Sequence, residues 1–175
     1  MSETEARAVS QTTPQLVVVC GLPGVGKTTV AEDIAERLDG RLLRTDVIRK
    51  ELLSDPDYTE EEARMVYREM FDRASDLIEE GTSAVLDGTF KEEGYRDHAI
   101  DLSETLDAEF RLVKVECDEE VVRERIAGRV DDESDADFEI HQMYRDQFES
   151  ISRTHLTVDN SEAMTDTLRQ VEEQF

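Results

Sequence analysis

The residues with the most specific chemical spacing form an eight-residue segment, Gly21-Leu-Pro-Gly-Val-Gly-Lys-Thr28, which matches G-x-x-x-x-G-K-[ST] without a mismatch. Its glycines let successive backbone N–H groups point at phosphate oxygens, and the helix that follows adds its positive end. Lys27 can reach the β- and γ-phosphates, and the Thr28 hydroxyl can bind Mg²⁺. The segment therefore predicts binding of a nucleoside triphosphate. The expected nucleotide-binding residues are Gly21, Leu22, Pro23, Gly24, Val25, Gly26, Lys27, Thr28 and Thr29.

A second candidate is the pair Asp46 and Arg49, which follows a short strand predicted at 41–45. The carboxyl ends of strands in open α/β sheets face the ligand crevice, so Asp46 lies where a base or acceptor ligand is needed. Arg49 is three residues further on, on the same helix face, and suits an anionic or hydroxyl-rich acceptor. Two simpler interpretations stay open: Asp46 caps the helix expected at 47–53, and Arg49 is a solvated helix residue.

Asp87 closes the apolar segment Ala84-Val-Leu86, a pattern typical of a carboxylate that holds Mg²⁺, usually through water. The alternative is a turn residue before Gly88. In the next helix, Arg96 is a candidate contact of the acceptor, whereas His98 is expected to be a surface residue.

Arginines gather in a third segment, Arg123-Glu-Arg-Ile-Ala-Gly-Arg129, which leads into an acidic loop. Arg125 and Arg129 are four residues apart and share a helix face. Gly128 is a natural hinge, so residues 123–137 are expected to form a lid whose arginines offset charge on the transferred phosphoryl group. The alternative is an exposed helix with ion pairs to nearby glutamates.

The elements that must position these residues alternate between strand and helix. Apolar periodicity and turn residues predict strands at 16–20, 41–45, 83–86, 110–117 and 156–158. Helices are expected at 27–38, 47–53, 60–80, 95–106, 119–127 and 138–151, with a last helix capped by Ser161 and ending near Phe175. This order predicts an α/β fold with a parallel sheet, as one domain over 14–175 after a disordered lead-in at 1–13.

The composition restricts the partners. Acids outnumber bases 44 to 20 in 175 residues, for a formal charge of −24. This balance argues against nucleic acid or an anionic membrane as a partner. The 16 arginines against 4 lysines, within an acidic coat, favour adaptation to concentrated salt, with an ordinary acidic protein as the alternative. The chain shows no long apolar run and no signal peptide, which predicts a soluble cytoplasmic protein, and we expect a monomer. Cys20 and Cys117 are expected to be reduced thiols that bind no metal.

In the order and spacing of these segments the chain resembles the small P-loop kinases of the AAA-type ATP-binding family, relatives of zeta toxins, gluconate kinase and polynucleotide kinase. The resemblance covers about Leu16 to Asn160. It implies a three-layer sandwich with strand order 2-3-1-4-5 and adenine between the lid helix and the Asp159-Asn160 turn, which makes Asn160 a nucleotide contact. It also implies that Asp46 is the base or a ligand of the acceptor hydroxyl, Arg49 an acceptor contact, and Arg125 and Arg129 the lid arginines.

The leading functional prediction is transfer of the γ-phosphoryl group of Mg-ATP to a hydroxyl of a small molecule. A second is a nucleotide or polynucleotide 5′-hydroxyl kinase. The absence of a basic run argues against a long polynucleotide as the acceptor but leaves short 5′ ends open. A third is an ATP-binding switch, against which the Asp46–Arg49 pair argues, because a switch needs no acceptor site. The acceptor, and the choice between ATP and GTP, stay open.

Overall fold

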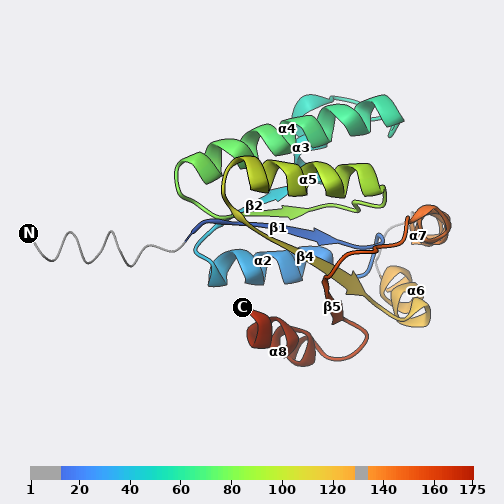
Figure 1. Ribbon diagram of the computed structural model, residues 1–175. Coiled ribbons are helices and arrows are strands. Elements are labelled where there is room, and N and C mark those ends of the chain that lie inside the picture. Colours follow the sequence, from blue (N-terminus) through green and yellow to red (C-terminus); the bar gives the residue numbers. More distant parts are fainter. Residues whose placement is uncertain (1–12, 129–133) are drawn as a thin grey trace, which may run out of the picture.

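A computed structural model describes residues 13–128 and 134–175, the side chains of 134–137 excepted. Its sheet is parallel, with strand order β2-β3-β1-β4-β5, which confirms the predicted order (Figure 1). The five strands are β1 (Gln15–Cys20), β2 (Arg41–Arg44), β3 (Ala84–Asp87), β4 (Glu109–Glu116) and β5 (Leu156–Asp159). The predictions that fall on residues 1–12 and 129–133 lie outside the described residues.

The central strand shows why the chain forms this sheet. Val17, Val18 and Val19 are fully buried, as β-branched residues are in a parallel strand that is covered on both faces. The register places Val19 opposite Asp87 on β3, and Asp87 opposite Arg44 on β2. The carboxyl ends of β1, β2 and β3 therefore lie side by side, and the candidate site lies at this edge of the sheet.

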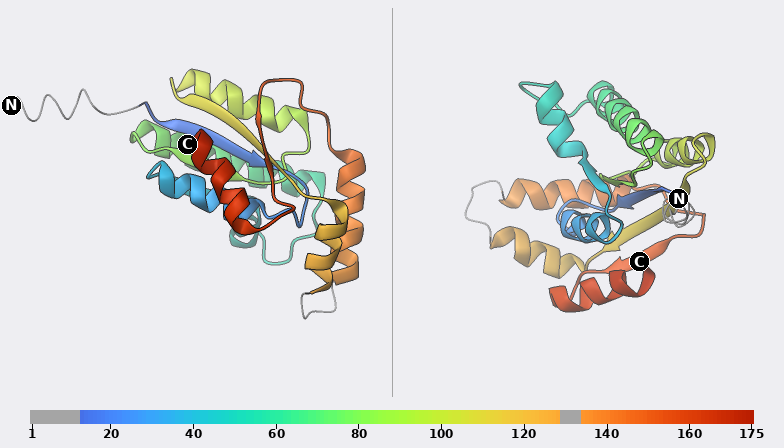
Figure 2. Two further views of the ribbon diagram at one scale, coloured as in Figure 1. Left: turned by 90° about the horizontal axis from the view of Figure 1, so that it is seen from below. Right: turned by 90° about the vertical axis from the view of Figure 1, so that its left-hand side faces the viewer.

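The helices cover both faces of the sheet (Figures 1 and 2). On one face lie α3 (Thr45–Leu52), α4 (Glu60–Glu79) and α5 (Glu93–Thr105), and on the other α2 (Lys27–Arg37) and α8 (Met164–Gln174). The remaining two, α6 (Glu119–Ala127) and α7 (Ser134–Gln147), lie beside each other at the end to which the strands point. The result is the predicted three-layer sandwich.

Alternation along β1 divides the core into two parts. Leu16, Val18 and Cys20 pack with α4 and α5 residues such as Met70 and Ala99. Val17 and Val19 pack on the other face with residues of α2, α6 and α8. A slip of β1 by one residue would move every side chain of the strand to the opposite core.

Several predicted boundaries are wrong. Thr45 begins α3 instead of ending β2, so Asp46 lies in the first turn of the helix and is not its cap. The Asp46 carboxylate bonds the Val47 N–H and the Arg44 guanidinium, and an acid in a first turn is favoured by the helix dipole. Ser161 does not cap the last helix, because its hydroxyl accepts a hydrogen bond from the Asp118 N–H instead. That helix begins at Met164.

Two other helices are displaced along the chain from their predicted positions. The helix expected at 95–106 begins at Glu93, and the helix expected at 138–151 is α7, Ser134–Gln147. The start of α7 therefore lies within the segment that was expected to be a polar loop. A single-sequence pattern has little to mark this start, because Ser134-Asp-Ala-Asp137 is polar and can cap, turn or begin a helix.

The acidic side chains whose burial the structure describes lie at the surface, with one exception. Among the described residues Asp87 is the one carboxylate that is buried. Nearly all of the negative charge of these described side chains therefore lies where dissolved ions can screen it. Among the helices of the described part of the chain, none combines the length and apolar character that crossing a membrane requires.

We expect the melting temperature to rise from low salt to molar KCl. The reason is that the screening length falls from about 10 Å at 0.1 M to about 3 Å at 1 M, which weakens repulsion within the acidic coat. Thermal unfolding across a KCl series measures this. A parallel sucrose series separates screening from general exclusion of solutes. A melting temperature that KCl does not change would contradict salt adaptation.

Candidate active site

The loop between β1 and α2 has a backbone suited to phosphate. Gly24 and Gly26 have φ of 87° and 90°, in the left-handed region that favours glycine. Gly26 is also the N-cap of α2, and no side chain from the described residues caps this helix start. The first N–H groups of α2 are therefore available to an anion, and the helix dipole attracts one. The loop thus has the backbone conformation that the predicted phosphate binding requires.

Lys27 and Thr28 begin α2 and point toward the end of β3. The Thr28 hydroxyl donates a 2.7 Å hydrogen bond to Oδ2 of Asp87, and the Lys27 ammonium donates to the Leu22 carbonyl of its own loop at 3.0 Å. Burial lowers the pKa of Lys27, against the opposing charge of Asp87. Burial also raises the pKa of Asp87, against the Thr28 hydrogen bond and the Lys27 and Arg44 charges.

Thr28 and Asp87 are chemically suited to Mg²⁺. They offer a hydroxyl and a carboxylate, both hard oxygen ligands, beside a loop that can supply phosphate oxygens. Among the described residues there is no group of three or more His, Cys, Asp or Glu side chains that could hold a metal. Two protein ligands completed by phosphates and water are the usual arrangement for Mg²⁺ at a nucleotide.

Arg44 is a site residue that the sequence analysis missed. Its guanidinium bonds Oδ2 of Asp46 at 2.8 Å and lies 3.7 Å from Oδ2 of Asp87. It therefore links the candidate base to the candidate magnesium ligand. In the sequence Arg44 is simply the last residue of a strand, and only the register opposite Asp87 brings it to the site.

A cavity of about 610 Å³ joins the phosphate loop to the segment with Asp46 and Arg49. Its lining includes Lys27, Thr28 and Asp87, and also Asp46 and Arg49. The structure therefore brings together the predicted phosphate, magnesium and acceptor residues. The rest of its lining consists of Pro23, Thr45, Tyr58, Gly88, Thr89, Ile140, Met143 and Tyr144.

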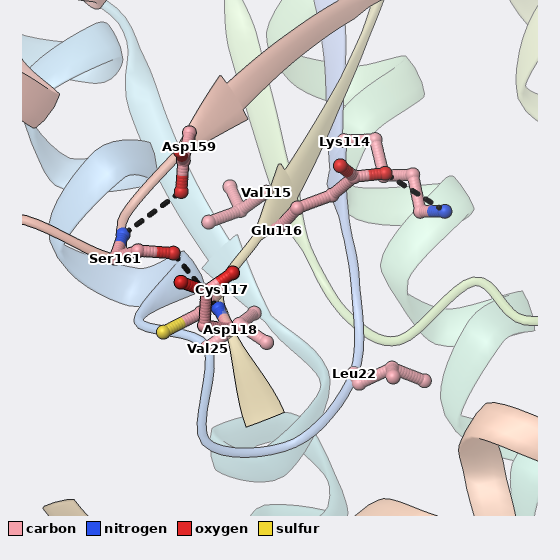
Figure 3. A pocket seen from close by; sticks show the side chains of 9 residues that line it. All are labelled: Leu22, Val25, Lys114, Val115, Glu116, Cys117, Asp118, Asp159 and Ser161. Carbon is pink, nitrogen blue, oxygen red and sulfur yellow. Dashed lines mark hydrogen bonds and ion pairs between the residues drawn. The ribbon is translucent and has the colours of Figure 1, made fainter. Parts of the chain in front are cut away.

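A second cavity, of about 320 Å³, lies beside the carboxyl end of β4 (Figure 3). It is lined by Leu22, Val25, Lys114, Val115, Glu116, Cys117, Asp118, Asp159 and Ser161. Figure 3 shows Ser161 linking Asp118 to Asp159 along its wall. This cavity adjoins the phosphate loop and includes Asp159 of the turn to which the family resemblance assigns the adenine.

Asn160 itself points elsewhere. Its side chain is buried, and its amide donates to the Val25 carbonyl at 2.8 Å while its oxygen accepts from Thr167 at 2.6 Å. A Cβ on Gly26 would clash with this amide. The structure therefore places the Asn160 side chain against the backbone of the phosphate loop, where it positions the loop, and not in either cavity that adjoins the loop.

Arg96 does not reach the large cavity. It is buried, its guanidinium lies 5.2 Å from the Phe148 ring centre, and Nη2 donates to the Glu149 carbonyl at 2.8 Å. The sequence placed it correctly at the start of a helix but could not show which face it occupies. Its contacts hold the segment after α7 against α5.

The predicted lid, 123–137, lies partly outside what the structure describes: residues 123–127 belong to α6 and 134–137 to the start of α7, whereas 129–133 are not described. Arg129 is outside the described residues, and Arg125 is exposed, with Nη1 3.5 Å from the Cys117 sulfur. Both cysteines are free, and burial raises the pKa of each thiol, of Cys20 to about 11. Thr29 is exposed at the start of α2.

His141 is a further contact that the sequence did not reveal. It is buried on α7, and its Nδ1 lies 2.7 Å from the Pro23 carbonyl, to which it donates a hydrogen bond. This bond ties α7 to the phosphate loop. A lone histidine in an amphipathic helix carries no sequence signal for such a role.

We expect Asn160→Ala to weaken binding of ATP, GTP and inorganic tripolyphosphate by similar factors. The change leaves the buried Val25 carbonyl unpaired, at a cost of about 1–3 kcal/mol, removes the shorter of the two hydrogen bonds of the Thr167 hydroxyl, and loosens the loop that would hold phosphate in all three ligands. Titration calorimetry measures the three affinities. Thr167→Val, which keeps the bond to Val25, is the control and should bind nearly as wild type does. If Asn160→Ala changed the ratio of ATP to GTP affinity but left tripolyphosphate binding intact, Asn160 would contact the base.

We expect Asp87→Asn to raise the melting temperature at pH 7, by about 2–4 °C for each kcal/mol gained. The pKa of Asp87 is raised in the fold, so its ionised form opposes folding at neutral pH. The gain should vanish as the pH falls below the ordinary carboxyl range, where wild-type Asp87 is itself protonated. Asp101→Asn, at an exposed carboxylate, is the control. A variant less stable than wild type at pH 7 would show that the cations around Asp87 outweigh its burial.

Comparison with known proteins agrees with this geometry. A sequence model described as an AAA domain matches residues 16–151. The uncharacterized protein Rv2004c of Mycobacterium tuberculosis is 31% identical over 142 residues, which cover 73% of this chain and 28% of that protein. The chain thus spans less than a third of the length of this relative. A UPF0200 protein of Aeropyrum pernix is 39% identical over 85 residues, 42% of this chain and 45% of that protein.

Solved structures share the fold at low identity. APE1195 superposes with a TM-score of 0.76 at 20% identity, covering 93% of each chain. The M. tuberculosis APS kinase CysC, solved with AMPPNP and APS, gives 0.73 at 16% identity, covering 93% of this chain and 95% of that chain. A Sinorhizobium meliloti gluconokinase gives 0.70 at 19% identity, covering 91% and 90%. The fold is that of P-loop kinases, and the match over residues 16–151 shows that the chain belongs to the AAA-domain family.

Proposed function

We propose that the protein is a kinase that transfers the γ-phosphoryl group of Mg-ATP to a hydroxyl of a small molecule. One observation carries the proposal: a single cavity holds Lys27, Thr28 and Asp87 together with Asp46 and Arg49. A protein that only binds or hydrolyses a nucleotide has no need of the second group. Kinases with known acceptors among the structures of similar fold support the same class of reaction.

In the proposed reaction each residue has a distinct task. The phosphate loop and Lys27 hold the β- and γ-phosphates, and Thr28 and Asp87 would hold Mg²⁺, which offsets charge on the phosphoryl oxygens. Asp46 accepts the proton of the acceptor hydroxyl as that oxygen bonds to the γ-phosphorus. The bond between this phosphorus and the bridging oxygen breaks, and ADP leaves with its electron pair. Arg49 positions the acceptor.

The exposure of Asp46 fits the task of a base. Its side chain is 59% exposed, whereas that of Asp87 is 6% exposed. Asp46 can therefore meet an incoming hydroxyl, while Asp87 stays with Thr28. Arg125 and Arg129 are the proposed lid cations. The alternative of a nucleotide or short 5′-end kinase uses the same residues and differs only in the acceptor.

The test is ADP release from Mg-ATP in molar KCl with separate pools of sugars and sugar acids, nucleosides and nucleotides, 5′-hydroxyl oligonucleotides, and aminoglycosides. We expect one pool to stimulate release, and Asp46→Ala to reduce that stimulated rate by about 10²–10⁴-fold, the usual contribution of a positioned base. Asp55→Ala is the matched control, at an exposed carboxylate that does not line the cavity. Slow release that neither the pools nor Asp46→Ala change would favour the ATP-binding switch.

A further inference from the structure

Several exposed apolar side chains gather in the lining of the large cavity. The described residues include seven large apolar side chains that are exposed, and three of these, Tyr58, Ile140 and Met143, line this one cavity. Tyr144, half-buried, lines it too. Exposed apolar groups that gather in a cavity mark a binding surface more often than ones that are scattered singly.

The wall comes from two separate parts of the chain. Ile140, Met143 and Tyr144 are three and four residues apart on α7 and so share one face of that helix. The His141–Pro23 hydrogen bond fixes α7 beside the phosphate loop, at the carboxyl end of the strands (Figure 1). This face of α7 is therefore turned toward the cavity.

Tyr58 enters from the loop between α3 and α4 in a strained backbone conformation. Its φ is 58°, where a bulky residue is uncommon. The Tyr58 N–H donates to the Glu62 carboxylate at 3.0 Å, and Thr59 caps α4, so the first turn of that helix holds the strained residue in place. Strain of this kind is retained most often where a side chain must be aimed at a ligand.

Arg49 adds charge and a planar surface to this wall. Its guanidinium lies 4.8 Å from the centre of the Tyr58 ring, and its buried Nε has no hydrogen-bond partner among the described residues. A buried donor without a partner favours a ligand that supplies an acceptor atom. Tyrosine rings and a guanidinium plane together favour a flat ring that can stack, with an anionic group nearby.

Resting on the proposed function, we propose that the acceptor joins a planar aromatic ring to a hydroxylated, anionic part, which is the chemistry of a nucleoside monophosphate. The hydroxylated part lies at Asp46 and Arg49, and the ring lies against Tyr58, Tyr144 and Met143. A bare sugar acid satisfies Arg49 but leaves the apolar wall facing water. The volume of the cavity, about 610 Å³, lies within the usual range for sites that bury a whole small ligand.

The test compares ribose 5-phosphate with the four ribonucleoside 5′-monophosphates, which share its sugar and phosphate and add only the base. Calorimetry in molar KCl with Mg²⁺ and saturating AMPPNP keeps the ATP site filled. We expect at least one nucleotide to bind about 10-fold or more tightly than ribose 5-phosphate, since stacking a base on an aromatic side chain contributes on this scale.

Variants of the lining residues then test whether the aromatic side chains cause the preference for the nucleotide over ribose 5-phosphate. Tyr58→Asn and Tyr144→Ser should each reduce the preference for the nucleotide several-fold and leave ribose 5-phosphate binding nearly unchanged. Asparagine tolerates the left-handed backbone at position 58, so this variant adds no strain. Tyr58→Phe keeps the ring and should bind as wild type does. Met65→Ser, at an exposed apolar residue that does not line the cavity, is the second control.

The outcomes separate this inference from the proposed function. Equal affinity for ribose 5-phosphate and all four nucleotides, or a preference that survives loss of both tyrosines, overturns the inference. ADP release stimulated only by a non-aromatic acceptor, and unaffected by Tyr58→Asn, also overturns it while the kinase proposal stands. Tight nucleotide binding that never stimulates ADP release supports the aromatic site and overturns phosphoryl transfer.

Discussion

The hydrogen bond from Thr28 to Asp87 joins the two elements on which the rest of the site depends. It connects the first turn of α2 to the end of β3 at 2.7 Å, deep enough that Asp87 is the one buried carboxylate among the described residues. Keeping a carboxylate there costs free energy, which shows in its raised pKa. Nearby cations offset part of this cost. Active sites often show such a trade-off between stability and activity.

Arg44 extends this balance to the acceptor side. By bonding Asp46 and lying near Asp87, it keeps two carboxylates at one edge of a chain whose formal charge is −24. Without a cation between them, the two acids would repel each other and any incoming phosphate. Arg44 and Asp87 lie opposite each other in the β2–β3 register. Their position therefore contributes both to the packing of the sheet and to the charge balance of the site.

The sequence predicted what local patterns can encode. The phosphate loop, the strand order implied by the family resemblance, and the grouping of Lys27, Thr28, Asp87, Asp46 and Arg49 all appear in the structure. The sequence patterns did not predict contacts between residues that are far apart in the chain. Asn160 turned to the loop backbone, and Arg96 to Phe148, because which face a side chain occupies depends on tertiary packing. Arg44, Tyr58 and the α7 face were missed for the same reason, since none carries a motif and each reaches the cavity only through folding.

The direction of the sheet has a practical consequence for handling the protein. The strands run toward the cavities, while α8 runs back so that its last residues meet the start of β4, where Arg111 bonds the Gln174 carbonyl and covers the Phe175 ring. Gln15, where β1 begins, pairs with Glu109 at the start of β4 and so lies at that same edge. Reporter domains or surface tethers joined at either end of the described fold would therefore lie at the edge opposite to the candidate active site and leave both cavities uncovered.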